Sequence, residues 1–109
     1  MLKVQKNGKI MLTRGDTARL NVNINNDSQP YEISTDDELK MTVKRNARDE
    51  DIGFQKVVKG GTLIHIKPED TAGLGFGKYV YDIQLTTAAG DVYTIIGPET
   101  FELLQACTC

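Results

Sequence analysis

The sequence predicts an all-β fold, an antiparallel sandwich of about seven short strands with one short helical turn. Apolar and polar residues alternate with a period of two in several segments, which is typical of strands with one buried face. Residues that favour turns separate these segments at intervals of about 8 to 12 residues. A chain of 109 residues is also long enough for one core that needs neither metal nor disulfide.

The first two strands are predicted at residues 9–13 and 18–24. In the second of them, Ala18 and every second residue after it are apolar. Arg14-Gly15-Asp16 lies between the two strands, so we expect them to lie close together. This tripeptide occurs in integrin ligands. Here, however, glycine and aspartate are explained by the turn between the two strands, because both residues favour turns.

A cluster of turn-forming residues at 25–30 leads to a very short extended segment at 31–33. Residues 39–44 alternate again and predict a strand with its apolar side chains facing inward. The polar and charged residues 46–53 predict an exposed loop.

A β-hairpin is predicted next, from residues 54–59 through a tight turn at Gly60-Gly61 to residues 62–66. Proline and early acidic residues at 68–72 favour one short helical turn.

A long inner strand is predicted at residues 79–85, after the glycines that end the helical turn. Tyr79 lies near its start, as in the corner of immunoglobulin-like sandwiches where a tyrosine hydroxyl bonds to upstream backbone. We therefore expect an immunoglobulin-like sandwich, with a sandwich of another lineage or a small barrel as the alternatives. The sequence has no tryptophan, which argues against an antibody-type domain.

The last predicted strand pairs back on the inner strand through a hairpin loop at residues 87–91. It covers residues 92–96 and resumes at 100–104. Gly97-Pro98 interrupts it, because proline donates no ladder hydrogen bond and implies a bulge or an edge.

One domain is expected at residues 9–104, between a flexible N-terminus at 1–8 and a flexible C-terminal tail at 105–109. Charged residues interrupt the apolar ones near the start, so no export signal is expected. No apolar run approaches the roughly 18 residues of a membrane-spanning helix.

The charge balance disfavours nucleic acid as a partner. The chain has 13 Lys and Arg against 15 Asp and Glu, a net charge of -2. Nucleic-acid-binding domains usually carry a basic surplus.

Catalytic and metal-binding signals are weak, so we predict no enzymatic activity, cofactor or metal. His65, the single histidine, has no cysteine or second histidine nearby in sequence to complete a catalytic pair. The acids at 36–38 and 49–51 lack the alternate spacing of a calcium loop. Cys107 and Cys109 supply two thiolates, whereas structural zinc sites use four ligands.

The four tyrosines are the remaining candidates for a ligand-binding site. Tyr79 and Tyr81 fall on the inward face of their strand, which leaves Tyr31 and Tyr93 as a surface pair. Tyrosine presents a flat apolar ring with a polar tip, which suits sugars. A carbohydrate-binding or cell-surface adhesion module is therefore one hypothesis.

Three segments resemble the N-terminal domain of the phage baseplate upper protein family and related short prophage-encoded proteins of Gram-positive gut bacteria. They are IMLTRGDTA at 10–18, LKMTVKRN at 39–46 and GKYVYDIQL at 77–85. The resemblance extends over about residues 9–103.

The resemblance implies a non-enzymatic virion structural module that docks to tail or baseplate proteins and forms a homo-oligomer in the assembly. Its location would be the virion tail or baseplate, after synthesis in the host cytoplasm. The given sequence ends at Cys109, before the helical linker and the receptor-binding-protein docking domain of the family pattern, so we expect either a stand-alone short relative or only the anchoring part. We expect the apolar pair Leu103 and Leu104, in the C-terminal strand, to lie near a subunit contact.

Overall fold

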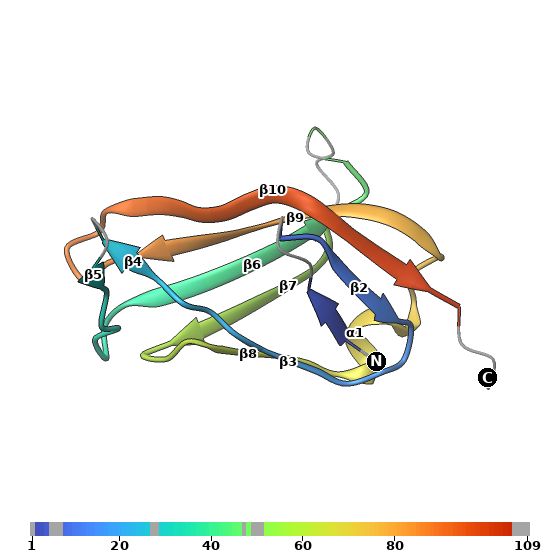
Figure 1. Cartoon of the computed structure of the whole chain (residues 1–109), viewed down its shortest axis with the longest axis horizontal. Coiled ribbons are helices and arrows are strands. Elements are labelled where there is room, and N and C mark those ends of the chain that lie inside the picture. Colours follow the sequence, from blue (N-terminus) through green and yellow to red (C-terminus); the bar gives the residue numbers. More distant parts are fainter. Residues whose placement is uncertain (1, 5–7, 27–28, 47, 49–51, 106–109) are drawn as a thin grey trace.

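A computed structural model describes residues 2–4, 8–26, 29–46, 48 and 52–105, which form strands and one short helix (Figure 1). The strands are β1 (Leu2–Val4), β2 (Ile10–Thr13), β3 (Ala18–Asn21), β4 (Asn25–Asn26), β5 (Gln29–Pro30), β6 (Glu38–Lys44), β7 (Ile52–Lys59), β8 (Leu63–Ile66), β9 (Gly77–Thr86) and β10 (Val92–Leu104). The helix is α1 (Pro68–Ala72). The predicted all-β, sandwich-like architecture with one short helix is confirmed.

The larger layer is a six-stranded sheet in the order β1-β2-β10-β9-β6-β7. Its pairs are antiparallel except one, since β2 runs parallel to β10 with Ile10 opposite Phe101. The expectation of an entirely antiparallel sandwich is therefore wrong at this pair. After β2 the chain crosses to the other layer instead of folding back, which leaves the edge of β2 open to the last strand.

The smaller layer is the antiparallel pair β3 and β8, in which Ala18 lies opposite Ile66. Strands β2 and β3, expected to lie close together, belong to different sheets. The predicted hairpin of residues 54–59 and 62–66 is also wrong, because β7 pairs with β6 whereas β8 pairs with β3. Gly60, at a φ of +74°, turns the chain from one layer to the other.

Two short segments also differ from expectation. Residues 31–33 are not a strand; the two-residue strands β4 and β5 pair just before them. At the N-terminus, β1 pairs with β2, so the expected flexible segment at 1–8 contains a strand. In the tail predicted at 105–109, residues 106–109 lie outside the described residues.

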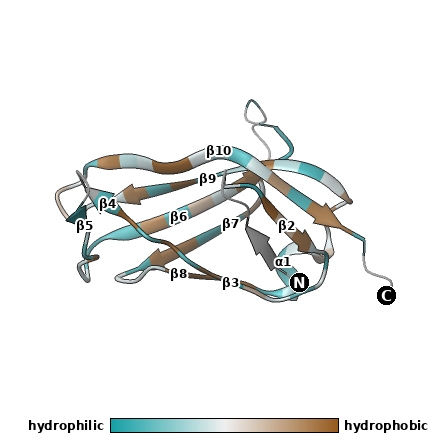
Figure 2. Cartoon of the chain, in the orientation of Figure 1, coloured by the Kyte–Doolittle hydropathy of each residue, from teal (hydrophilic) through white to brown (hydrophobic). Residues whose placement is uncertain are grey.

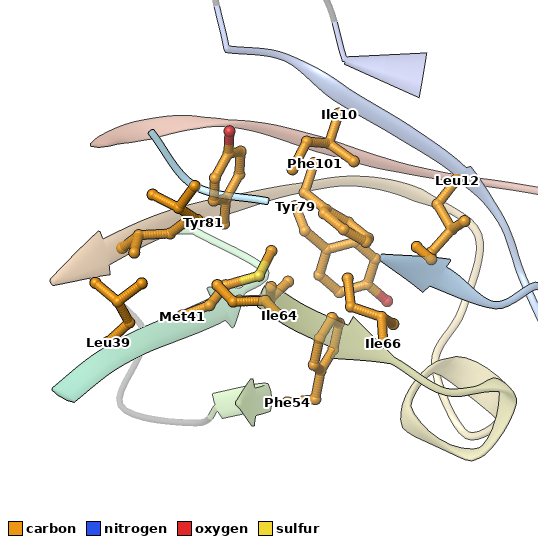
Figure 3. Packing of buried hydrophobic residues seen from close by; sticks show 14 of the residues in the cluster. Ile10, Leu12, Leu39, Met41, Phe54, Ile64, Ile66, Tyr79, Tyr81 and Phe101 are labelled. Atoms are coloured by element: carbon orange, nitrogen blue, oxygen red, sulfur yellow. The ribbon is translucent and has the colours of Figure 1, made fainter. Parts of the chain in front are cut away.

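The core lies between the two layers, where side chains from both point toward one another (Figure 3). Figure 2 shows the bands of hydrophobic and hydrophilic residues along the strands that produce this arrangement. The ring of Phe101 is 0% exposed and meets Phe54 and Tyr81 edge-on, with centroids 5.7 and 6.4 Å away. Burial of such a ring stabilises the fold by about 1.5–3 kcal/mol, so Phe101 anchors the C-terminal part of β10.

The tyrosine corner predicted from the sequence is confirmed. The Tyr79 hydroxyl donates a hydrogen bond of 2.8 Å to the Gly75 carbonyl. The Arg45 guanidinium lies 4.5 Å from the centre of the Tyr79 ring. Tyr79 thereby ties the glycine-containing loop after α1 to the start of β9.

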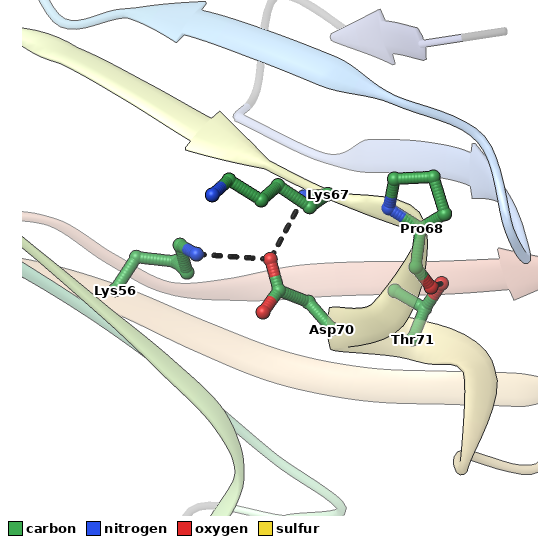
Figure 4. Close-up of polar contacts among 5 residues, drawn as sticks. All are labelled: Lys56, Lys67, Pro68, Asp70 and Thr71. Atoms are coloured by element: carbon green, nitrogen blue, oxygen red, sulfur yellow. Dashed lines mark hydrogen bonds and ion pairs between the residues drawn. The ribbon is translucent and has the colours of Figure 1, made fainter.

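Helix α1 begins as predicted, with Pro68 in its first turn. The Asp70 carboxylate accepts hydrogen bonds from the Lys67 amide (2.8 Å) and the Lys56 ammonium (3.0 Å), as drawn in Figure 4. Burial raises the pKa of Asp70, but these two donors outweigh it, so the pKa lies below its usual value. The aspartate therefore joins α1 to β7.

The hairpin of β9 and β10 closes through a loop in which Gly90 has a φ of +91°. Strand β10 changes register between Thr94 and Ile96 and again between Ile96 and Glu99. Gly97, at a φ of +93°, lies in the second irregularity before a cis bond to Pro98. The predicted bulge at Gly97-Pro98 is thus confirmed, and the strand continues through it to Leu104.

Candidate functional site

Tyr31 and Tyr93, the surface pair predicted from the sequence, line one cleft. The cleft has a volume of about 360 Å³ and is otherwise mainly apolar; its remaining lining residues are Ile24, Asn25, Leu85, Thr87 and Ile95. Tyr93 is 54% exposed, whereas Tyr79 and Tyr81 are 6% and 3% exposed. Tyr79 and Tyr81 are therefore inner residues and Tyr93 an outer one, as predicted, whereas Tyr31 is half-buried and packs against the core.

Different elements hold the two tyrosines. Tyr93 lies on β10 opposite Leu85 of β9. Tyr31 follows β5, and its amide donates a 2.8 Å hydrogen bond to the Ile24 carbonyl. The cleft therefore lies between the long hairpin of the large sheet and the segment that leaves β3.

A buried carboxylate fixes the Tyr31 side of the cleft. Asp37, 2% exposed, accepts hydrogen bonds from the Ser34 amide (3.0 Å), the Tyr31 hydroxyl (2.7 Å) and the Ala88 amide (3.0 Å). The Ser34 amide, followed by the Tyr31 hydroxyl, lowers the pKa of Asp37. The same hydrogen bond to Asp37 raises the pKa of Tyr31. Asp37 thus links the loop before β6 to the turn between β9 and β10.

A second cleft of about 440 Å³ follows the same seam between the layers. Its lining residues are Ile10, Arg19, Leu20, Asn21, Val22, Asn23, Tyr81, Ile83 and Ile96. The Tyr81 hydroxyl donates a hydrogen bond to the Gly8 carbonyl, and burial, then the nearby Glu99 charge, raises the pKa of Tyr81 to about 12. Both clefts are bounded by β10 or β9 on one side and by residues 19–25 on the other.

The edge of β10 beside these clefts is open. Within the described part of the chain, β2 covers this side of β10 only from Phe101 to Leu104, whereas β9 pairs with the other side from Val92 onward. Val92 is 57% exposed. Proline at position 98 predicts a bulge or an edge in this strand, and the open side of β10 before Phe101 agrees with that prediction.

Backbone groups on this edge follow from the hairpin register. The Thr87 amide donates to the Asp91 carbonyl at 2.8 Å, and Tyr93 lies opposite Leu85. Hydrogen-bonded and non-bonded pairs alternate in an antiparallel ladder. The backbone amide and carbonyl of Tyr93 therefore bond to β9. The backbone amide and carbonyl groups of Val92 and Thr94 point to the open side.

The outer edge strand β7 differs in charge from this open edge. It carries Lys56 and Lys59, and lysine on an edge strand opposes pairing with another chain. The open stretch of β10 has no such charge before Glu99. It is the better template for an added strand.

Leu103 and Leu104 do not join this surface. Leu103 is 1% exposed and belongs to the core, so its expected place in an interaction surface is wrong: the parallel strand β2 covers it. Leu104 is half-buried opposite Thr13, and its carbonyl accepts the Arg14 amide at 2.9 Å. These leucines lie at the other end of β10 from Tyr93.

The Arg14-Gly15-Asp16 segment is built into the fold, as the turn interpretation predicts. The Arg14 guanidinium lies 4.3 Å from the centre of the Phe76 ring and donates to the Leu74 carbonyl at 3.2 Å. The Gly15 amide donates to the Thr71 hydroxyl at 3.0 Å. The arginine is therefore engaged with the loop after α1.

The remaining candidates contribute no chemistry to the clefts. His65 is half-buried between the fully buried Ile64 and Ile66, the alternation that the sequence predicts. No group of three or more His, Cys, Asp or Glu side chains that could hold a metal ion occurs among the described residues. The acids at 49–51 and the cysteines Cys107 and Cys109 lie outside those residues.

Comparison with known protein families and with curated protein sequences finds no match to this chain. Over the described residues, the structure contains no helix with the length and apolar character needed to span a membrane.

Proposed function

We propose that this chain is a non-enzymatic structural protein of a phage or prophage virion, an anchoring module of a baseplate or tail fibre that acts through protein–protein contacts. The observation that carries the proposal is the open, uncharged edge of β10 beside two apolar clefts. An exposed strand edge offers backbone hydrogen bonds to a partner strand, and neighbouring apolar pockets take its side chains.

The resemblance to the baseplate family supports the choice of partners, which are phage tail or baseplate proteins. The segments that carry it lie on β2, β6 and β9, strands of the large sheet. Location in the virion tail or baseplate, after synthesis in the host cytoplasm, follows from the same proposal.

The test is to induce prophages in the source strain and purify the particles on a density gradient. Mass spectrometry then measures this chain relative to the major tail protein. We expect a fixed, low ratio in intact particles. Absence from particles, with the protein present in the same lysate, would refute the proposal.

A pair of matched variants shows whether the open edge makes the contact. Val92→Lys places a charge on the open edge, and Val57→Lys places the same charge on β7. The two valines are 57% and 53% exposed. We expect Val92→Lys alone to reduce incorporation into particles, whereas equal incorporation of both variants would argue against the edge.

Carbohydrate binding or cell-surface adhesion is the second candidate, because Tyr31 and Tyr93 line the same cleft. This function predicts a chain that is retained on host cell-wall glycan and released by free sugar. Tyr93→Ala should then abolish retention, whereas Val57→Ala should leave it intact. Retention that both variants keep would exclude the tyrosine cleft as the glycan site.

A further inference from the structure

We propose that a second copy of this chain occupies the open edge of β10, with residues 92–94 of the two copies paired antiparallel across a two-fold axis at Tyr93. The inference rests on the proposed function, because it names the partner of the same edge. It differs from the expectation of a contact at Leu103 and Leu104, which lie at the opposite end of the strand.

The backbone of this edge is complementary to itself. Val92 and Thr94 both direct an amide and a carbonyl group to the open side. With the axis at Tyr93, Val92 of each copy lies opposite Thr94 of the other, and each such pair can exchange two hydrogen bonds. The pairing uses the residues that precede the first irregularity of β10.

The side chains are complementary as well. The two Tyr93 rings meet at the axis, and aromatic cross-strand pairs stabilise a sheet more than alanine pairs do. Val92 and Tyr93, 57% and 54% exposed in the single chain, lie on opposite faces of the sheet, and the strand of the second copy covers part of each. Pairing therefore reduces the exposure of two apolar side chains per copy.

Charge also favours a second copy in this register. Residues 92–98 carry no charge, and the nearest acids are Asp91 and Glu99. Asp91 of one copy falls opposite Ile95 of the other, and Glu99 lies beyond the paired residues. No like charges therefore face each other across the axis, an arrangement that would be destabilising.

The shape of β10 limits the assembly to two copies. The irregularity after Thr94 interrupts the regular register of the strand, and a bulge twists an edge away from further pairing. A two-fold contact uses the same patch on both copies and closes on itself.

Disulfide cross-linking tests this register directly. A non-hydrogen-bonded pair has Cα atoms about 4.5 Å apart, within the range of a disulfide. Tyr93→Cys is made in a chain that also carries Cys107→Ser and Cys109→Ser, so that it holds a single thiol. Val57→Cys in the same background is the control. Under mild oxidation we expect a species of twice 12.1 kDa from Tyr93→Cys and a single chain from Val57→Cys.

Sedimentation of the unmodified chain supplies an independent readout. The mass should rise above 12.1 kDa as the concentration increases. Val92→Lys should weaken association at least tenfold, and Val57→Lys should leave it unchanged. A single-chain mass at every concentration, with no more cross-linking of Tyr93→Cys than of Val57→Cys, would overturn the inference.

The outcomes separate this inference from the proposed function. A chain that stays single in solution but needs Val92 for incorporation into particles binds a foreign strand at the edge, which refutes the second copy and supports the virion role. A chain that cross-links through residue 93 but is absent from particles supports the second copy and refutes the virion role.

Discussion

Replacement of Tyr79 by phenylalanine removes one hydrogen bond and leaves the ring in place. The lost bond joins the Tyr79 hydroxyl to the Gly75 carbonyl at 2.8 Å. Gly75 is exposed, so water can bond to its carbonyl in the variant, and the loss is limited to the net value of one hydrogen bond, about 1 kcal/mol. The Arg45 contact with the ring, at 4.5 Å, is retained.

The expected change in melting temperature follows from the chain length. Unfolding entropy is about 2.1 cal/mol/K per residue, so for 109 residues a loss of about 1 kcal/mol lowers the melting temperature by about 4 °C. Circular dichroism during heating measures the melting temperature, and urea unfolding measures the free energy of unfolding. Tyr93→Phe is the control, since Tyr93 is 54% exposed and a surface substitution changes stability by about 0.5 kcal/mol or less. Equal melting temperatures of the two variants would refute the role of the corner.

Two further predictions concern a buried carboxylate and a glycine. The hydrogen bonds donated to Asp37 hold its pKa below 3.8, so its stabilisation is complete above about pH 4 and is lost as pH falls through the lower folded-state pKa. Asp37→Asn should lower the urea midpoint at neutral pH but much less near pH 2. The same loss of urea midpoint at both pH values, or an equal loss in Asp36→Asn, would show that the Asp37 carboxylate is not what stabilises the fold. Gly97 has a φ of +93° and lies where an added Cβ would be 2.5 Å from the Tyr81 carbonyl oxygen, so Gly97→Ala should cost about 2 kcal/mol or more in urea unfolding. Gly73→Ala, with open space around it, is the control, and equal stability of the two variants would disprove the steric argument.

Period-two alternation predicted the strands and their buried faces well, because it depends only on which residues must avoid water. It placed Leu39, Met41 and Val43 in the core, where all are 0% exposed. It also placed Tyr79 and Tyr81 inside, which left Tyr31 and Tyr93 as a surface pair; the cleft that both line depends on how distant segments pack and could not be predicted from alternation.

Strand partners were harder to predict, because alternation defines the face of a strand and not its neighbour. Gly60-Gly61 matches a hairpin turn in sequence, but the Gly60 amide bonds to the Asp37 carbonyl at 2.8 Å, while the Thr62 carbonyl accepts from Val22 at 2.9 Å. These two contacts, from distant parts of the chain, send the chain to the second layer. Leu103 was misplaced for a similar reason, since nothing local indicates that β2 lies beside it.

The parallel pairing of β2 with β10 also determines when the fold can form during protein synthesis. Ile10 lies opposite Phe101 and Leu12 opposite Leu103, so these partners are synthesised some ninety residues apart. At about 5–20 residues per second, the ribosome needs roughly 5 to 20 s to cover that interval. The hairpin of β6 and β7 is complete much earlier, whereas β2 has only β1 beside it until β10 emerges at the end of synthesis. Ile10 and Leu12, which are 1% and 0% exposed in the folded protein, are therefore accessible to chaperones, and to aggregation, for most of the time that the nascent chain exists.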